Sequence, residues 1–208
     1  PTKKWIAPSG VGRLSRMNRF ITFSFLLVVL VTAAKPVRAA GEIDVLTMQI
    51  AEEGSSISSG RAVGVLEHRL EEVLPVVLDY ENYVHFMPNF TKSKVLAQRG
   101  SRAMVYMEVS VASGTFTLWG QLKLSEQSPD GTTRVVEARL LNGNIDAFSA
   151  TWRLKPVDDG SRTEVEFQLY VDPNMPLPAS VFSRENERAA GKTVRALRTR
   201  VVETSAGS

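Results

Sequence analysis

The chain has 208 residues, of which 25 are Lys or Arg and 22 are Asp or Glu, and its formal net charge is +3. It contains no cysteine, which excludes disulfide bonds, thiolate nucleophiles and metal sites built on cysteine. A positive net charge usually suggests a nucleic-acid partner, but in this chain the excess of basic residues lies in the first forty positions.

The first forty residues have the layout of an export signal. Five basic residues, the last of them Arg19, precede an apolar run over 20–34. This run is shorter than the ~20 residues that span a bilayer as a helix, and Val37-Arg38-Ala39 suits a cleavage site. The sequence predicts a signal peptide over 1–39, cleaved after Ala39, with an uncleaved membrane anchor as the alternative.

Removal of residues 1–39 changes the charge of the protein. It takes away seven basic residues and no acidic one, so 18 basic residues face 22 acidic ones and the formal charge becomes −4. Nucleic acid is therefore excluded as the main partner. The remaining chain, 40–208, is expected to form a single domain that buries about two thirds of its unfolded surface.

The first part of this domain combines extended and helical patterns. Extended segments are predicted at 43–50 and 61–66, with a Gly/Ser-rich bend over 54–60 between them. Apolar residues at three- and four-residue spacing predict a short helix over 69–79, which Pro75 should kink or shorten.

A second helical piece, about 80–87, should end before Pro88, because proline disfavours a helical residue ahead of it. The aromatic-rich segment that contains it, 78–90, is typical of a lid over a pocket.

From Ser93 to Val171 the apolar residues alternate with polar ones, as in half-buried strands. The predicted apolar faces are Val105, Met107, Val109 and Val111; Phe116, Leu118, Leu122 and Leu124; Val136, Ala138 and Leu140; Phe148, Ala150, Trp152 and Leu154; and Val165, Phe167, Leu169 and Val171. Turns are predicted at 112–114, 128–131, 142–144 and 158–160, where glycine tolerates positive φ. A sheet that is apolar on one face is antiparallel and must bury that face.

One long helix, 177–202, is the element that can cover the sheet. Ala190, Val194, Leu197 and Val201 form its inner stripe. The predicted fold class is α+β, a helix-grip: a curved antiparallel sheet of about six or seven strands wrapped around the C-terminal helix, with two short helices after the first strand.

This order of elements resembles the START-like superfamily, also called SRPBCC, of lipid carriers and polyketide cyclases. Within it, the chain looks most like the branch of coenzyme Q-binding proteins and the ribosome-association toxin. The resemblance covers about 60–204, and its motifs are Leu78-Asp-Tyr-Glu-Asn-Tyr83 with Phe86-Met-Pro88, Trp152-Arg-Leu-Lys-Pro156, Val171-Asp-Pro173 with Leu177-Pro178, and Leu197-Arg-Thr-Arg200.

The resemblance implies a cavity between sheet and long helix that holds a hydrophobic or amphipathic ligand. The residues expected to line it are Phe86, Met87, Val105, Met107, Phe116, Leu118, Leu140, Phe148, Ala150, Trp152, Phe167, Leu169, Asn186, Ala190 and Val194. The alternative is that each of these side chains simply fills the core, although a sheet that wraps one helix favours a ligand site.

Four polar or amphipathic residues have two interpretations. Helical spacing places Asn186 on the inner stripe, where its partner is a ligand head group or a neighbouring strand or water. Strict alternation puts Tyr106 and Trp119 outside the sheet, unless a bulge near a glycine reverses them. Asp146 either begins a strand or touches the ligand.

The sequence offers little catalytic chemistry. His68 and His85 lie seventeen positions apart without metal-ligand spacing, and there is no phosphate loop or nucleophile elbow. No catalytic residue, metal or cofactor is expected. We therefore expect an exported carrier for a lipid, isoprenoid quinone or polyketide-like molecule.

Two alternative functions remain. In a cyclase or aromatase, Asp146 or His85 would transfer protons within the same cavity. A ribosome binder is disfavoured by the signal peptide, because ribosomes are absent from the export compartment.

The last helix also carries a basic stripe. Arg184, Arg188, Lys192 and Arg195 recur on the face away from the inner stripe. This predicts peripheral docking on an anionic membrane through Arg188, Lys192 and Arg195, with an ordinary solvated helix face as the alternative.

Overall fold

A computed structural model describes residues 45–207 of the chain. The predicted signal peptide, its cleavage site and the first residues of the predicted strand 43–50 lie outside this range. Everything below concerns the described residues.

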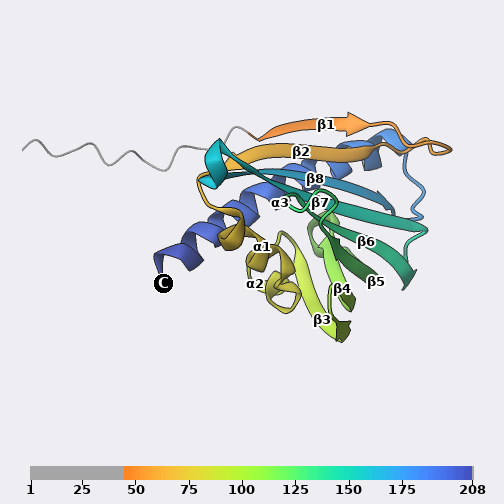
Figure 1. The fold of residues 1–208 in the computed structure, drawn as a ribbon. Helices are drawn as coiled ribbons and strands as arrows, with labels where there is room; N and C mark the ends of the chain where they lie inside the picture. Colours follow the sequence, from red (N-terminus) through yellow and green to blue (C-terminus); the bar gives the residue numbers. More distant parts are fainter. Residues whose placement is uncertain (1–44, 208) are drawn as a thin grey trace, which may run out of the picture. The chain divides into compact units, whose positions relative to one another are not determined.

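The domain is built on one antiparallel sheet of eight strands (Figure 1). Its strands are β1 (Leu46–Ile50), β2 (Ser59–Leu66), β3 (Phe90–Arg99), β4 (Arg102–Val111), β5 (Phe116–Gln127), β6 (Arg134–Gly143), β7 (Ala147–Val157) and β8 (Arg162–Asp172). Their spatial order is β1-β2-β8-β7-β6-β5-β4-β3, so all connections join neighbouring strands except the helical segment between β2 and β3. The predicted helix-grip class is confirmed, but the sheet has eight strands instead of six or seven, and the short helices follow the second strand, β2, instead of the first.

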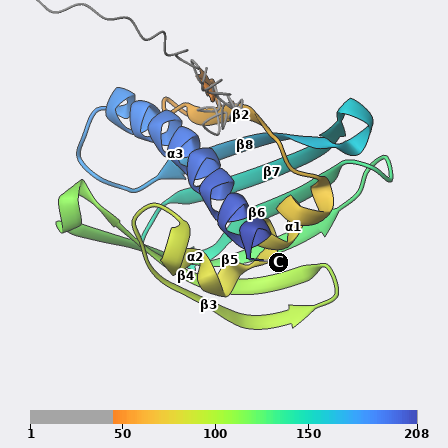
Figure 2. The same ribbon diagram turned by 90° about the vertical axis from the view of Figure 1, so that its left-hand side faces the viewer.

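The helical segments lie on one side of this curved sheet (Figure 2). They are α1 (Leu70–Leu78), the 3-10 turn η1 (Tyr80–Asn82), α2 (Tyr83–Phe86) and the long α3 (Ala179–Ala206); two further short 3-10 turns, η2 (Ala112–Gly114) and η3 (Asp158–Gly160), join strands. Among the described helices, none is both long enough and apolar enough to cross a membrane.

Local chemistry explains the short helices. The Glu72 carboxylate accepts a hydrogen bond of 2.8 Å from the backbone N–H of Arg69, which caps α1 and lowers the pKa of Glu72. Pro75 lies inside α1, which is only nine residues long. α2 ends at Phe86, and Met87 is extended with ψ 140°, as expected for a residue that precedes proline.

The turn predictions are correct at three of the four places. The segments 112–114, 128–131 and 158–160 contain glycines with positive φ. At 142–144 the predicted turn is displaced: Gly143 is the last residue of β6 and its φ is not positive, and the bend that leads to β7 runs over 144–146. A Cβ on Gly143 would lie 2.5 Å from the carbonyl oxygen of Trp119, so glycine is needed there for close approach of two strands.

The pattern of alternating apolar residues does not predict strand β3. Most of its residues are exposed, and its pairing with β4 has two register shifts, between Phe90 and Lys92 and between Val95 and Ala97. It is an edge strand, so a clean alternation of apolar and polar residues is not required of it.

The long helix α3 packs on β1, β2 and β8, at one side of the sheet. Its buried stripe includes all four predicted residues, Ala190, Val194, Leu197 and Val201, each fully buried. Close contact with β2 depends on Gly60, where a Cβ would lie 2.2 Å from the carbonyl carbon of Asn186. The hydrophobic core lies between this stripe, α1 and the inner face of the sheet.

Candidate ligand-binding site

The inner face of the sheet is defined by the strand register. Val105 pairs with Leu122, which pairs with Leu140 across a bulge, and Ala138 pairs with Ala150. Because directly paired residues of antiparallel strands share a face, the predicted apolar residues from β4 to β8 form one continuous surface. This surface faces α3 and the short helices.

The predicted lining residues differ in how deeply they are buried. Nine are packed into the core: Met87, Val105, Met107, Ala150, Trp152, Phe167, Asn186, Ala190 and Val194. Five are only partly buried: Phe86, Leu118, Leu140, Phe148 and Leu169. The remaining one, Phe116, is 48% exposed. Of the partly covered sheet residues, Leu118, Leu140 and Phe148 lie on β5, β6 and β7, beyond the strands on which α3 packs, whereas Leu169 lies on β8 itself.

Small side chains lie at the centre of this surface. Ala138 and Ala150 face each other across β6 and β7, and both are 8% exposed. On β5, a Cβ added to Gly120 would lie 3.1 Å from Cδ1 of Leu140, so the Leu140 side chain extends over this glycine. We call Gly120, Ala138 and Ala150 the small-residue floor.

One side of α3 adds residues that were not predicted. Gly191 lies next to Thr47 of β1. Because successive residues of an α-helix are rotated by about 100°, the opposite side of α3 carries Phe182, Ala189 and Thr193. These three residues are partly buried. Arg200 shares this side, and its guanidinium lies 5.7 Å from the Phe86 ring centroid. The sequence contains the signal for these residues, because the helical spacing that predicts the inner stripe of α3 also predicts which residues lie beside it.

Asn186 is buried and bonded to the protein. Its side-chain Nδ2 donates to the carbonyl oxygens of Ser58 at 3.1 Å and Val171 at 3.3 Å. The nearby Ser183 hydroxyl accepts a hydrogen bond of 2.9 Å from the Ser58 N–H. Of the two interpretations of Asn186, the neighbouring strands are therefore the partners found, and contact with a ligand stays a prediction.

Tyr106 and Trp119 lie on the outer face, as strict alternation predicts. Their rings stack with centroids 5.9 Å apart, and the Tyr106 hydroxyl donates to Glu108 at 2.6 Å. The outer face also has a polar hollow of about 370 Å³, lined mainly by charged and hydroxyl side chains such as Arg61, Arg153 and Glu166. Its chemistry is unlike that of an apolar ligand site.

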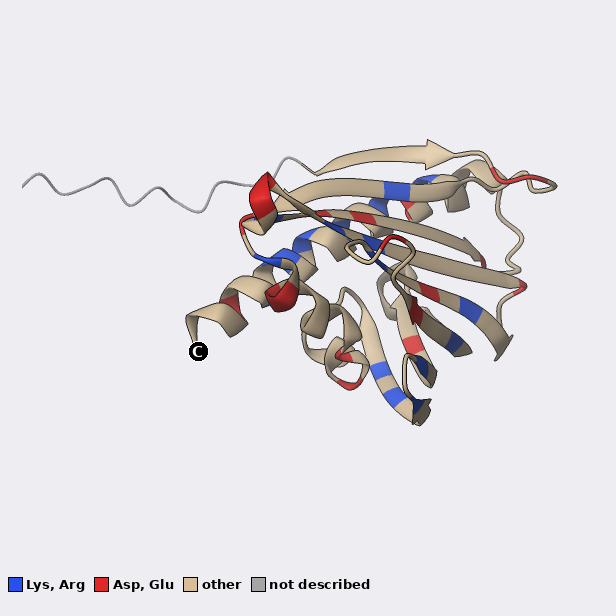
Figure 3. Ribbon diagram, viewed as in Figure 1, with Lys and Arg blue, Asp and Glu red and all other residues tan. Residues whose placement is uncertain are grey.

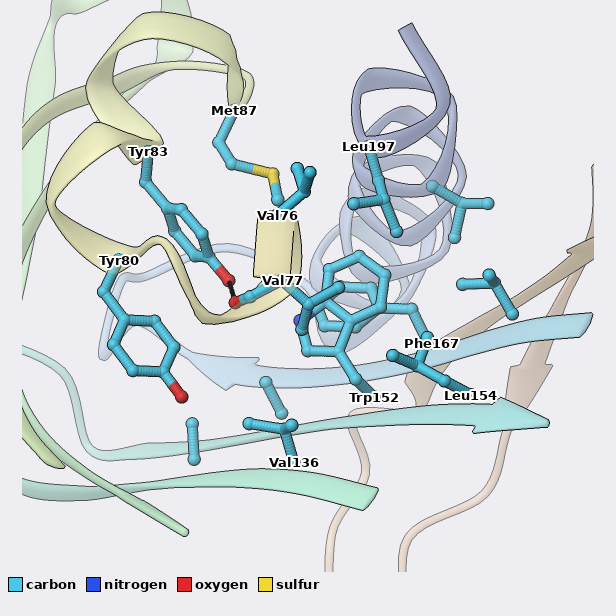
Figure 4. Close-up of a cluster of buried hydrophobic side chains, with 14 of the residues drawn as sticks. Val76, Val77, Tyr80, Tyr83, Met87, Val136, Trp152, Leu154, Phe167 and Leu197 are labelled. Atoms are coloured by element: carbon cyan, nitrogen blue, oxygen red, sulfur yellow. Dashed lines mark hydrogen bonds between the residues drawn. The ribbon is translucent and has the colours of Figure 1, made fainter. Parts of the chain in front are cut away.

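Two tyrosines of the predicted lid reach the core from η1 and α2 (Figure 4). Tyr83 donates a hydrogen bond of 2.6 Å to the carbonyl oxygen of Val77, and burial raises the pKa of its hydroxyl. Burial, with a smaller contribution from the charge of Glu126, raises the pKa of Tyr80 to about 12. Both phenols are thus neutral hydrogen-bond donors at physiological pH.

The histidines and Asp146 are not gathered at this surface. His85 and Asp146 are exposed, and His68 lies 3.6 Å from Glu72 on α1. Within residues 45–207, no group of three or more His, Asp or Glu side chains is arranged to hold a metal ion.

The comparison with family models identifies the class. Residues 66–198 match the family described as "Polyketide cyclase / dehydrase and lipid transport". This match covers more than half of the chain, which therefore belongs to this family. No curated protein matches the sequence.

Solved structures show the same fold at low sequence identity. A STAR-related lipid transfer protein from Xanthomonas axonopodis has a TM-score of 0.65 and 17% identity, covering 77% of this chain and 99% of that one. Human StAR-related lipid transfer protein 5 has a TM-score of 0.68 and 14% identity, covering 81% and 89%. The Zhui aromatase/cyclase from a Streptomyces species has a TM-score of 0.51 and 16% identity, covering 70% and 92%.

Proposed function

We propose that the protein is a carrier that holds a hydrophobic or amphipathic molecule against the inner face of its sheet. The observation that carries this proposal is the incomplete cover of that face. α3 packs on β1, β2 and β8, whereas Leu118, Leu140 and Phe148 of the remaining strands stay partly exposed. An apolar concave surface of this kind is the usual place for an apolar ligand.

The ligand classes that fit are a lipid, an isoprenoid quinone or a polyketide-like molecule. The likeness to coenzyme Q-binding proteins, suggested by the sequence motifs, remains part of this proposal. Solved relatives of the fold include both lipid transfer proteins and an aromatase/cyclase. The carrier is favoured because the proton-transfer candidates His85 and Asp146 are exposed.

The Ala150→Leu substitution tests the proposal by filling the small-residue floor. Its added atoms should weaken the binding of an apolar fluorescent probe about tenfold or more, because they occupy the space proposed for the ligand. If this space is free, the substitution should lower the free energy of unfolding by less than about 1 kcal/mol. Probe titration and denaturant unfolding measure the two effects.

Thr151→Leu is the matched control, since Thr151 is the next residue of β7 and faces outward opposite Gln168. It should leave probe affinity unchanged. A loss of about 1–3 kcal/mol in Ala150→Leu with unchanged probe affinity would instead identify the floor as a filled core and contradict the carrier.

We further propose that the protein acts after export, with its mature chain beginning at Ala40. The basic residues, apolar run and small residues before this position support the proposal. N-terminal sequencing of the protein from cells distinguishes it from an uncleaved anchor, which would retain residues 1–39 in the membrane fraction.

The basic stripe of α3 supports docking of this carrier on an anionic membrane. Arg184, Arg188, Lys192 and Arg195 are exposed. Basic residues recur along the ribbon of α3 (Figure 3), and Arg188 forms an ion pair of 2.6 Å with Glu185. Segment 184–200 contains six basic and two acidic residues. Each Lys or Arg near an anionic bilayer contributes about 1 kcal/mol at low screening.

Changing Arg188, Lys192 and Arg195 together to Gln should reduce co-sedimentation with phosphatidylserine vesicles at least tenfold. Binding of the unchanged protein should fall as salt is raised. A control that changes Lys94, Lys123 and Arg139, three exposed residues of the sheet, removes the same charge and should bind as the unchanged protein does. Equal loss in both triple variants would contradict a docking role for the stripe.

A further inference from the structure

Tyr80 and Tyr83 are both largely buried but differ in their hydrogen bonds. Each side chain is 6% exposed, and their rings meet edge to face with centroids 5.9 Å apart. The Tyr83 hydroxyl donates to Val77, whereas the Tyr80 hydroxyl has no hydrogen-bond partner among the described residues. Among the described residues, Arg61 Nε is the fully buried side-chain polar atom without a hydrogen-bond partner, so the Tyr80 hydroxyl keeps some access to solvent and can receive a partner from outside the protein.

The Tyr80 hydroxyl points at the inner face of the sheet. Figure 4 shows the ring extending from η1 towards the strand that carries Val136, with the hydroxyl at its sheet-facing end. Val136 pairs with Trp152, and the next pair on the same face is Ala138 with Ala150. The hydroxyl therefore lies where the tightly packed core gives way to the small-residue floor.

A carboxylate lies on the same part of the inner face. Glu126 of β5 is the register partner of Val136, so the two side chains share a face. Its Oε1 forms an ion pair of 3.3 Å with an amino group of Arg134, and its side chain is only 20% exposed. The influence of its charge on the pKa of Tyr80 is consistent with this proximity.

We propose that Tyr80 and Glu126 bind the hydroxyl group at the end of an otherwise apolar ligand, an inference that rests on the proposed carrier function. An alcohol can accept a hydrogen bond from the neutral Tyr80 phenol and donate one to the Glu126 carboxylate. Arg134 balances the charge of Glu126, which leaves a site suited to a neutral head group. The ligand class is therefore a long-chain or isoprenoid alcohol whose polar end meets Tyr80.

The experiment compares dodecanol with dodecane, which differ only in the hydroxyl group. Each ligand competes with an apolar fluorescent probe for the unchanged protein and for Tyr80→Phe, and the measured quantity is the ratio of the two affinities. The unchanged protein should prefer dodecanol about tenfold, the ratio that corresponds to 1.4 kcal/mol. Tyr80→Phe should reduce this preference about five- to tenfold while dodecane affinity is retained.

Tyr83→Phe is the matched control. It removes the hydrogen bond to Val77 and should lower the melting temperature, yet it should leave the ratio of affinities unchanged. Tyr80→Phe loses no hydrogen bond within the described protein and should melt at the same temperature as the unchanged protein or above it. Glu126→Gln should also lower the preference for the alcohol.

Each outcome has a definite meaning. If the unchanged protein binds both ligands but the ratio is the same in Tyr80→Phe, the hydroxyl site is refuted and the carrier function stands. If neither dodecanol nor dodecane displaces the probe, or the probe itself does not bind, the carrier function fails.

Discussion

Gly60→Ala is expected to lower the free energy of unfolding by about 3 kcal/mol. The physical reason is that an added Cβ would lie 2.2 Å from both the carbonyl carbon and the carbonyl oxygen of Asn186. These atoms belong to the backbone of α3, so relief requires moving the whole helix away from β2. Overpacking of this type costs about 1–3 kcal/mol and sometimes more. Urea unfolding followed by circular dichroism measures the change.

Gly191→Ala provides the comparison for this prediction. Its Cβ would lie 2.8 Å from Cγ2 of Thr47, a side-chain methyl group on β1 that can rotate away. Alanine is also favoured over glycine inside a helix by about 1 kcal/mol. Gly191→Ala should therefore leave stability nearly unchanged. Equal stability of both variants would contradict the close packing of α3 on β2.

Much of the fold follows from sequence patterns that have a direct physical cause. Alternation of apolar and polar residues predicts β4 to β8 because a half-buried strand must place every second side chain on the core side. The end of α2 follows from the restriction that Pro88 imposes on Met87. The four buried residues of α3 follow from helical spacing alone.

Other parts of the fold leave no such pattern. β3 is exposed at the edge of the sheet, so its side chains are not constrained to alternate. Gly143 looks like a turn glycine in the sequence, but it is required by the approach of the Trp119 carbonyl group from the paired strand β5. Backbone contacts between paired strands, which the sequence pattern does not show, decide such positions.

The site is predicted only in part for a related reason. Alternation places Trp152 and Phe148 on the same face, but it does not reveal that Trp152 is packed on Phe167 at 4.2 Å between ring centroids while Phe148 stays partly exposed. The alternating pattern identifies the face of the sheet on which a side chain lies, but it does not identify how deeply that side chain is buried. The lid segment was recognised from its aromatic residues, yet only the three-dimensional arrangement separates the unpaired hydroxyl of Tyr80 from the bonded hydroxyl of Tyr83.

Asn186 holds the first half of α3 to two strands, and its replacement tests how strongly. Its side chain is 4% exposed and donates to the carbonyl oxygens of Ser58, just before β2, and Val171, near the end of β8. Asn186→Ala removes both donors and leaves buried acceptors without this partner. We expect the free energy of unfolding to fall by about 2–3 kcal/mol, because each buried unsatisfied group costs about 1–3 kcal/mol.

Thr199→Ala is the control for Asn186→Ala, since the exposed Thr199 hydroxyl bonds only to Arg195 of its own helix, at 3.2 Å. Its effect should stay within about 0.5 kcal/mol.

The ratio of dodecanol to dodecane affinity decides between the two interpretations of Asn186. A residue that only joins α3 to β2 and β8 should leave this ratio unchanged when replaced, because both ligands then meet the same displaced helix. A selective loss of dodecanol binding would instead identify Asn186 as a second partner of the ligand hydroxyl group.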